Sequence, residues 1–398
     1  MTTIRQENRM TNELNINQYD SFIESTDWLK AHDLPIAITL EETLEPALGQ
    51  DAIIFPPTFA VAKGAPHPYQ IDVLDTRLTA QEAAQTGTEA NCCQIDGVGS
   101  QANRMESKFK ERPFNSLIPQ VVIRLNENTT ANLVDIGHRV ADGAIRFSGL
   151  RDEVTSAILA LKNEGNALPL CQLAPTSLIF GFWDSRPDTT MFKFGRMLTA
   201  NIYASNVEIV KRSAQFNPAF DPTAIGLASE VPKDDGEQSS NSGKAADGKD
   251  PMSKLGLRHV PAVGTHGGVR VYGRIIRRTQ INLARLRSLA VTANGQIDSA
   301  ATLRLRRYIV GLSLVAGRVQ PNYDLREGCL LRTSRMVSNL VFANGDNQPF
   351  KWEISDAYNF ASSTATEFGV GPTREIEFKT KAAQQAVEDM KKSKNGKK

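Results

Sequence analysis

The sequence of 398 residues has few cysteines and few histidines, and neither type is spaced for a metal site. The four cysteines are Cys92, Cys93, Cys171 and Cys329, and no pair has the C-x-x-C spacing of a zinc site. The five histidines are scattered, without metal-ligand spacing to one another. A G-x-S-x-G elbow, a P-loop and an H-E-x-x-H motif are missing too. These absences do not exclude an enzyme, but they favour a binding protein without a metal or another cofactor.

Long apolar runs are also missing. The longest, Tyr308 to Gly317, is far short of the roughly 20 residues that a membrane-spanning helix needs. The N-terminus is polar and lacks the apolar core of a signal peptide. We therefore expect a soluble cytoplasmic protein with reduced thiols and no membrane partner.

Lysine is missing from the segment Arg258 to Arg335, which holds fourteen arginines and only three acidic residues. The first hundred residues, by contrast, hold five basic and fifteen acidic residues, so the net charge of +2 hides an asymmetry. Arginine favours bidentate phosphate contacts and stacking on bases. The asymmetry indicates either a polyanion partner or self-assembly through opposite faces, while some of these arginines only solvate helix faces.

A glycine turn precedes a predicted helix in the stretch Ile95 to Arg112 (IDGVGSQANRMESKFKER). Gly97 and Gly99 lack a Cβ, so the backbone can turn tightly and approach a ligand closely. Ser100 is a suitable cap for a helix with an apolar inner face. A glycine turn that opens a helix combines free N–H groups with the positive end of the helix dipole, and it therefore predicts a phosphate site.

The pattern Gly97-x-Gly99-x-x-Ala102 also matches the dinucleotide-binding fingerprint. That fold needs a buried parallel strand before the glycines, and residues 90–94 make a poor central strand. No clear alternation of strands and helices follows. A dinucleotide-binding enzyme is therefore a distant alternative, and a helix-entry turn without a ligand is another.

The segment Leu133 to Leu150 predicts a helix in which His138, Asp142 and Arg146 are spaced at i, i+4 and i+8 on one face. Two interpretations follow. Either His138, Arg139 and Arg146 hold a ligand phosphate, or the face is a surface ladder of ion pairs.

Basic and aromatic residues alternate around Lys193 and Arg196, near Phe192, Phe194 and Tyr203. Such interleaving suits single-stranded nucleic acid, in which bases stack and phosphates pair with cations. An ordinary amphipathic strand with its aromatics inside is the alternative.

A second mixed segment is the predicted strand Val269 to Arg278. Its period-2 alternation places Arg270, Tyr272 and Arg274 on one face. A strand with arginine and tyrosine on its open face resembles the RNA-facing sheet of an RRM-type fold. The strand ends in two further arginines, Arg277 and Arg278.

The remaining pattern predicts further elements, a flexible insertion and a basic tail. Expected strands are Pro35–Leu40, Ile53–Val61, Tyr69–Leu74, Leu117–Leu125 and Thr176–Trp183. Expected helices are Ser21–Ala31, Leu78–Ala90, Arg151–Asn163, Ala300–Ala316 and Glu375–Met390. The polar, low-complexity stretch at 231–257 is expected to be a flexible insertion, and residues 381–398 a basic tail.

Four blocks of the sequence together resemble one protein family. They are GVGSQANRMES (Gly97–Ser107), DIGHRVADGAIRFSGL (Asp135–Leu150), LIFGFWDSR (Leu178–Arg186) and RRTQIN (Arg277–Asn282). In this order they are similar to the crRNA-binding backbone subunit, of the RAMP superfamily, in type I-G (formerly I-U) CRISPR Cascade interference complexes. The resemblance spans most of the chain.

The resemblance implies an α+β fold, with a ferredoxin-like or RRM-type core sheet, helices on one face and large insertions. It implies one elaborated domain over residues 21–380, shaped like a hand, with a thumb hairpin that we place at residues 54–72. It also implies that several copies form a filament along the crRNA, displace a base at intervals and present the others to the target DNA strand. Other Cascade subunits and, indirectly, a helicase-nuclease are the further partners implied.

The leading hypothesis is thus a non-catalytic RNA-binding subunit. A metal-dependent ribonuclease of the related type III kind, with a catalytic acid such as Asp96, is the alternative. The predicted RNA-binding residues are Gly97, Gly99, Ser100, Gln101, Asn103, Arg104, His138, Arg139, Arg146, Lys193, Arg196, Arg270, Arg274, Arg277 and Arg278.

Overall fold

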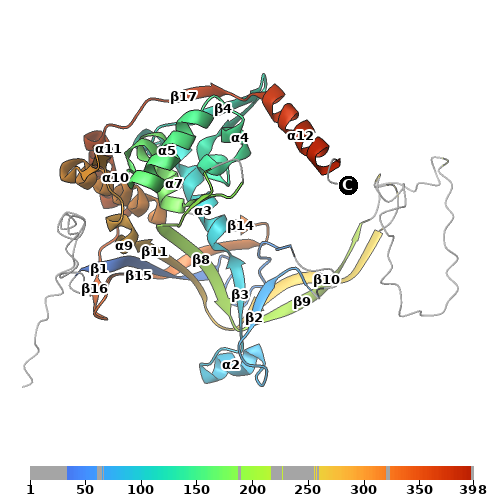
Figure 1. Ribbon diagram of the computed structural model, residues 1–398. Coiled ribbons are helices and arrows are strands. Elements are labelled where there is room, and N and C mark those ends of the chain that lie inside the picture. The colour runs from blue at the N-terminus through green and yellow to red at the C-terminus, as the bar shows by residue number, and fades with distance from the viewer. Residues whose placement is uncertain are drawn as a thin grey trace, which may run out of the picture.

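The fold is of the α+β class, with a curled antiparallel sheet and most helices on one of its faces (Figure 1). The structure is a computed structural model that describes residues 34–60, 65, 67–186, 190–216, 226, 255, 257, 260–319 and 323–395. Among these residues, no helix has the length and apolar character that would let it cross a membrane.

Four strands form the centre of the sheet in the spatial order β15 (Cys329–Phe342), β1 (Pro35–Pro46), β11 (Ile275–Asn282) and β8 (Leu198–Ser205). Every neighbouring pair is antiparallel. Numbered along the chain, the order is 4-1-3-2, and helices lie between the first and second and between the third and fourth strands. This is the ferredoxin-like arrangement that the resemblance implies.

Shorter strands extend the sheet on both sides. On one side lie β14 (Tyr323–Arg326) and β16 (Asn347–Pro349), and on the other β3 (Asn91–Asp96) and β2 (Gln70–Val73). In agreement with the prediction that residues 90–94 make a poor central strand, β3 is antiparallel and lies next to the edge strand β2. An antiparallel strand needs only one apolar face, and Cys93 and Ile95 supply it.

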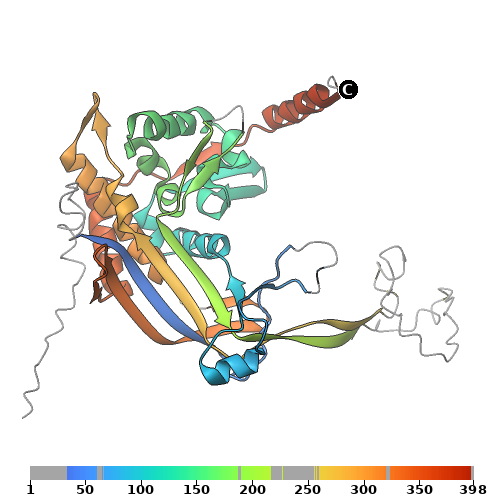
Figure 2. The ribbon, with the colours of Figure 1, turned by 60° about the horizontal axis from the view of Figure 1, so that its bottom comes forward.

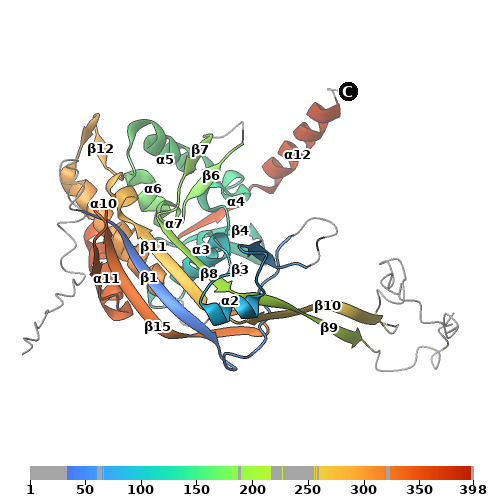
Figure 3. The ribbon, with the colours of Figure 1, turned by 90° about the horizontal axis from the view of Figure 1, so that it is seen from below.

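Alternation along the strands separates a face that packs on helices from an open face. In β8 the buried positions are Leu198, Ala200, Ile202 and Ala204, and the partly exposed ones are Thr199, Asn201 and Tyr203. Figure 3 looks onto the sheet with β15, β1, β11 and β8 side by side. Two helices, α10 (Ser299–Arg318) and α11 (Ile354–Phe368), pack together on the covered side. Asp298 caps α10, and Leu305, Ile309 and Leu312 of this helix are buried.

The chain between β3 and β8 forms the rest of the helical layer. Its helices are α3 (Val98–Glu106), α4 (Gly143–Arg146), α5 (Arg151–Glu164), α6 (Leu168–Leu173) and α7 (Pro175–Phe180). Short 3-10 helices lie between them: η3 (Ser107–Lys110), η4 (Phe114–Leu117), η5 (Leu133–Asp135) and η6 (Arg139–Ala141). Two small sheets complete the layer, one of β4 (Val121–Asn126), β5 (Thr129–Asn132) and β17 (Arg374–Glu377), the other of β6 (Phe182–Asp184) and β7 (Phe192–Phe194).

Two elements project from the body. A hairpin of β9 (Val207–Phe216) and β10 (Val260–Val271) continues the connection between β8 and β11 away from the sheet (Figure 2). Helix α12 (Thr380–Asn395) extends from the helical layer, so the predicted last helix starts later and runs further than expected (Figure 1). Smaller elements are α2 (Ala80–Thr86), α9 (Leu283–Arg287), β12 (Thr292–Ala293) and β13 (Gln296–Ile297).

Two predicted elements have a different structure. Thr176–Trp183 is not one strand, because residues up to Phe180 form α7 and a strand starts only at Phe182. A continuous apolar run suits a helix buried on all sides as well as a buried strand. The predicted helix 133–150 is broken into η5, η6 and α4. Arg139 adopts a left-handed φ of 53°, and Asp142 caps α4 instead of lying inside a helix. The helical face of His138, Asp142 and Arg146 therefore does not exist.

The predicted strand Val269–Arg278 is divided between two sheets. Its first part ends the hairpin strand β10, its last part begins β11, and the chain turns between them at Tyr272–Arg274. In the described part of the expected strand, residues 53–60, only Ile54 forms a bridge, to Val269. Three predicted regions lie wholly or partly outside the described residues. They are the expected helix 21–31, the insertion 231–257 except residues 255 and 257, and residues 61–64 and 66 of the thumb region.

Candidate nucleic-acid interface

A chain of buried polar side chains joins α3 to the sheet, and it contains two of the predicted RNA contacts. Arg277 Nη1 donates to Glu42 Oε2 at 2.6 Å, and Arg277 Nε donates to Gln101 Oε1 at 3.0 Å. Gln101 Nε2 in turn donates to Asp96 Oδ2 at 2.6 Å. Tyr323 donates its hydroxyl to the other Glu42 oxygen. Because Gln101 and Arg277 are at most 1% exposed, their prediction as RNA contacts is corrected to a structural role.

A second buried pair contains Arg139. Its Nε lies 2.7 Å from Glu106 Oε2, and its Nη1 donates to the carbonyl of Gly181 at 3.1 Å. Arg139 is 4% exposed and also lies over the ring of Phe180, so its prediction as a phosphate contact is corrected as well. Burial raises the pKa of Glu106 to about 7, although the guanidinium of Arg139 acts in the opposite direction.

Several other predicted residues gather beside these buried pairs, on the exposed side of α3. The helix is capped at Gly97, three residues before the predicted cap Ser100, so Ser100 lies in its first turn. Gly99, Ser100 and Asn103 are exposed. A Cβ at Gly99 would meet no atom within 4 Å, which leaves the backbone of this turn open to a ligand.

Three cationic or ionisable side chains lie on α3 or near Arg139, which contacts this helix. Arg104 is 31% exposed, lies 3.1 Å from Asp96 and donates to the carbonyl of Leu325. His138 and Arg196 are both exposed, and His138 directly precedes Arg139 in the chain. Arg139 donates a hydrogen bond to Asn103 at 3.5 Å. Burial is the main cause that lowers the pKa of Arg139, and the positive charge of Arg196 lowers it further, so the two guanidinium groups lie near each other. We call Gly99, Ser100, Asn103, Arg104, His138 and Arg196 the α3 surface.

The open face of the sheet carries a second group of arginines. A shallow hollow of about 670 Å³ is lined by Arg274, Arg278 and Arg335, with Glu41 as its one acidic residue. Arg278 pairs with Glu41 at 3.1 Å, and its side chain is 66% exposed. The hollow thus has an excess of positive charge.

Polar and aromatic groups complete this hollow. Tyr203 extends its hydroxyl to Gln94 at 3.5 Å. Asn201 also lines the hollow, and within the described part of the chain its buried Oδ1 finds no hydrogen-bond donor. We call Asn201, Tyr203, Arg274, Arg278 and Arg335 the open-face cluster.

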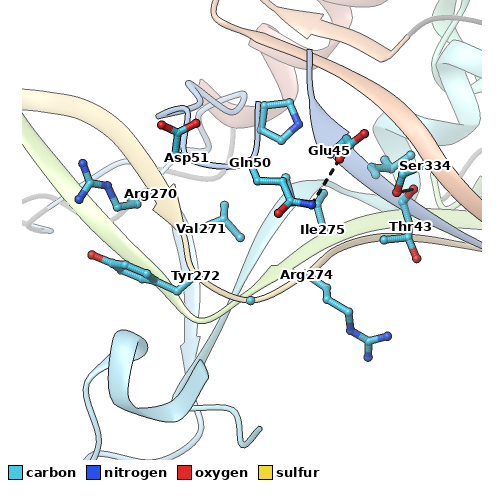
Figure 4. A pocket seen from close by; sticks show the side chains of 13 residues that line it. Thr43, Glu45, Gln50, Asp51, Arg270, Val271, Tyr272, Arg274, Ile275 and Ser334 are labelled. Atoms are coloured by element: carbon cyan, nitrogen blue, oxygen red, sulfur yellow. Dashed lines mark hydrogen bonds between the residues drawn. The ribbon is translucent and has the colours of Figure 1, made fainter. Parts of the chain in front are cut away.

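A second hollow of about 650 Å³ adjoins the open-face cluster where the hairpin leaves the sheet (Figure 4). Arg270 and Tyr272 lie on its hairpin side, and Arg274 lines both hollows. Tyr272 donates its hydroxyl to Glu208 at 2.8 Å. Gln50 reaches toward Glu45 at 3.4 Å. The structure therefore brings Arg270, Arg274 and Arg278 together, although not on one strand as predicted.

The other two predicted residues lie apart from both groups. Arg146 belongs to α4 and lies over the ring of Phe147, in a groove along α5. Lys193 lies on the outer face of β7 in the helical layer, with its ammonium 5.5 Å from the ring centroid of Trp183. Lys193 thus does not share a surface with the open-face cluster.

The sequence pattern missed two members of the open-face cluster. Arg335 was counted only as part of the arginine-rich segment, because no strand was predicted at β15. Asn201 was not predicted, although the strict alternation of residues 198–205 was the signal that would have placed it beside Tyr203 on the outer face.

The geometry bears on two alternatives. Strand β3, which precedes the glycine turn, pairs antiparallel with both β2 and β8, whereas the dinucleotide fold needs a parallel strand there. Asp96 is 1% exposed and bonds Gln101 and Arg104, so its carboxylate is not presented to a metal or a substrate. The described residues contain no group of three or more His, Cys, Asp or Glu side chains that could hold a metal ion.

Residues 38–209 match the model of a protein family described as CRISPR-associated protein GSU0053. The matched range starts in β1 and ends in β9, so it includes the glycine turn, the helical layer and β8. Among curated proteins, none matches the sequence. Over this range, which is less than half of its length, the chain is similar to that CRISPR-associated family.

Proposed function

We propose that the protein is the non-catalytic backbone subunit of a type I-G CRISPR interference complex. In this function it holds the phosphate backbone of the crRNA on the α3 surface. Copies assemble side by side along the guide, and the bases that they present pair with the target DNA strand. Other subunits of the complex, and a helicase-nuclease that degrades the target, are the further partners proposed.

The exposed glycine turn of α3 is the observation that carries the proposal. The first turn of a helix offers unpaired backbone N–H groups and the positive end of the helix dipole. At Gly99 nothing within 4 Å would block a phosphate from approaching this backbone. His138 and Arg196 are exposed near Arg139, which bonds Asn103 of this helix, and Arg104 is partly exposed at the next turn. A row of such contacts suits a sugar-phosphate chain, which carries one negative charge per nucleotide.

The β9–β10 hairpin is the better match for the inserted thumb. It is inserted between the second and third core strands, and its strands of 10 and 12 residues extend away from the sheet. The described part of residues 54–72, where the sequence placed the thumb, contributes only the bridge at Ile54 and the start of the short strand β2. We therefore assign the displacement of a guide base to the hairpin.

A negative charge introduced in the first turn of α3 tests the RNA site. Ser100→Glu puts a carboxylate where the phosphate is expected. Because an acid in the first turn of a helix is favourable, the variant should fold at least as well as the wild type. Ser299→Glu is the matched control, since Ser299 is exposed in the first turn of α10, far from the α3 surface. Binding of a fluorescent single-stranded RNA is measured by anisotropy over a series of salt concentrations.

We expect Ser100→Glu to weaken RNA binding by about tenfold or more, and Ser299→Glu to leave it unchanged. Arg196→Gln should lower the slope of log affinity against log salt by about 1, as the loss of one phosphate contact does. Arg124→Gln removes another exposed arginine, on β4, and serves as its control. Unchanged binding in Ser100→Glu and Arg196→Gln, with a loss in Arg278→Gln, would move the RNA site to the open-face cluster.

A further inference from the structure

Trp183 is unusual in being a largely exposed tryptophan on a regular strand. Its side chain is 65% exposed, whereas Trp352 is 3% exposed in the core. Strand β6 alternates, with Phe182 and Asp184 buried and Trp183 on the outer face. An exposed indole of this size is more typical of a binding site than of an ordinary surface position.

The hairpin that carries Trp183 is held by buried contacts at several points. The ring of Phe182 stacks on that of Phe194 at 6.2 Å on the inner face. Asp184 accepts hydrogen bonds from the backbone N–H and the hydroxyl of Thr190, at 3.0 and 2.6 Å. Arg186 donates to the carbonyl of Ala141. Because these contacts fix the hairpin, the backbone at Trp183 is already ordered. The loss of conformational entropy when a ligand binds to the indole is therefore small.

The charge beside the indole is positive. Lys193 is directly opposite Trp183 in the β6–β7 pairing, and its Nζ is 5.5 Å from the ring centroid. The adjacent groove along α5 carries three arginines and three aspartates, namely Arg146, Arg151, Arg186, Asp142, Asp152 and Asp184, so it adds no net charge. Among the residues that the structure describes here, Lys193 is therefore the excess charge, and Arg196 follows two residues after the end of β7.

We propose that Trp183 and Lys193 form a stacking contact for single-stranded nucleic acid. A base lies on the indole, and the neighbouring phosphate pairs with the ammonium of Lys193. An aromatic ring beside a cation is the combination that single-stranded nucleic acid uses, because every base has a stacking face. The inference rests on the proposed function, since that supplies such strands: the crRNA and the target strand.

Binding affinity and tryptophan fluorescence test the contact. Full-length protein is titrated with a single-stranded RNA of about 30 nucleotides, and the same measurements are made on Trp183→Leu, Trp183→Phe and Lys193→Gln. Stacking is worth ~1–3 kcal/mol per base, so Trp183→Leu should bind roughly 5- to 150-fold more weakly. Trp183→Phe keeps a ring and should lose about threefold at most. The wild type should show fluorescence quenching that Trp183→Phe lacks.

Two further arms identify the strand. Quenching by the RNA alone indicates contact with the guide, and quenching that appears only after complementary single-stranded DNA is added to the RNA-bound protein indicates contact with the target strand. Arg124→Gln is the control for loss of one exposed cation and should bind as the wild type, in contrast to Lys193→Gln.

Wild-type affinity in Trp183→Leu would overturn the inference, and so would equal losses in Trp183→Leu and Trp183→Phe, because stacking requires a ring. If Trp183→Leu changes only self-association, measured by light scattering, the indole contacts protein and the inference is wrong. In each case a weakened Ser100→Glu variant would leave the proposed function intact. A wild-type protein that binds no RNA would instead refute the proposed function.

Discussion

Arg277 and Arg278 are adjacent in β11, and the structure predicts opposite consequences for their replacement. The side chain of Arg277 points to the helices and is 1% exposed, with Glu42 at 2.6 Å. The side chain of Arg278 points to the open face and is 66% exposed, with Glu41 at 3.1 Å. The two substitutions Arg277→Met and Arg278→Met therefore remove the same chemical group from environments that differ mainly in burial.

The difference in burial sets the expected loss of stability. Arg277→Met leaves the carboxylate of Glu42, itself 3% exposed, without its charged partner, and it removes a donor from Gln101. Breaking a buried pair in this way costs ~3–5 kcal/mol of the free energy of unfolding. An exposed pair such as Arg278 and Glu41 contributes ~0–1 kcal/mol. Equilibrium unfolding in urea, followed by circular dichroism, measures both changes.

A paired substitution separates the charge from the packing. Glu42→Leu combined with Arg277→Met removes both charges, so the double variant should recover part of the stability that Arg277→Met loses. RNA affinity, measured where the variants are folded, should stay within about threefold for Arg277→Met. A tenfold loss of RNA affinity with an unchanged free energy of unfolding would contradict the structural role of Arg277.

Two other predictions concern buried groups. Burial raises the pKa of Glu106 from its ordinary 4.5 to about 7. Between pH 4.5 and 7, Glu106 is therefore protonated in the folded protein and ionised in the unfolded chain. The free energy of unfolding should therefore fall by about 3 kcal/mol as the pH rises from about 4.5 to 7 and level off above it, and the difference from Glu106→Gln, measured by urea unfolding at each pH, isolates this slope. An identical pH dependence in both proteins would refute it. Gly181→Ala should lower stability by more than 2 kcal/mol, because φ is +73° and the new Cβ would lie 2.7 Å from the carbonyl oxygen of Phe194. Gly165→Ala, with φ +68° and open space around it, should lower stability by only about 1 kcal/mol in the same assay. Equal losses of stability in the two variants would mean that the contact between the new Cβ at position 181 and Phe194 is relieved.

The fold class followed from the sequence because its strongest signals are local. Helix α10 has a capping aspartate and a long apolar stripe, and α5 ends at Gly165 in a left-handed conformation, so both were predicted within a few residues. The break in segment 133–150 was not predicted. Asp142 is compatible both with the interior of a helix and with its N-cap, and only tertiary packing decides between the two positions.

The site was harder to predict, because the burial of an arginine cannot be read from its type. The sequence identified the glycine turn and the arginine-rich segment, and these lie at the α3 surface and the open-face cluster. It did not identify Arg139 and Arg277 as buried partners of Glu106 and Glu42, since each carboxylate is far away in the sequence. Successive side chains of a strand point to opposite faces of the sheet, so Arg277 is buried whereas its neighbour Arg278 is exposed.

The location of RNA on the folded protein tests the central claim most directly. Protein bound to single-stranded RNA is cross-linked with ultraviolet light, and the attached peptides are identified by mass spectrometry. The account predicts cross-links within residues 97–107 and in the peptides that contain His138 or Arg196. Cross-links confined to the peptides of Arg278 and Arg335, with none at α3, would contradict it.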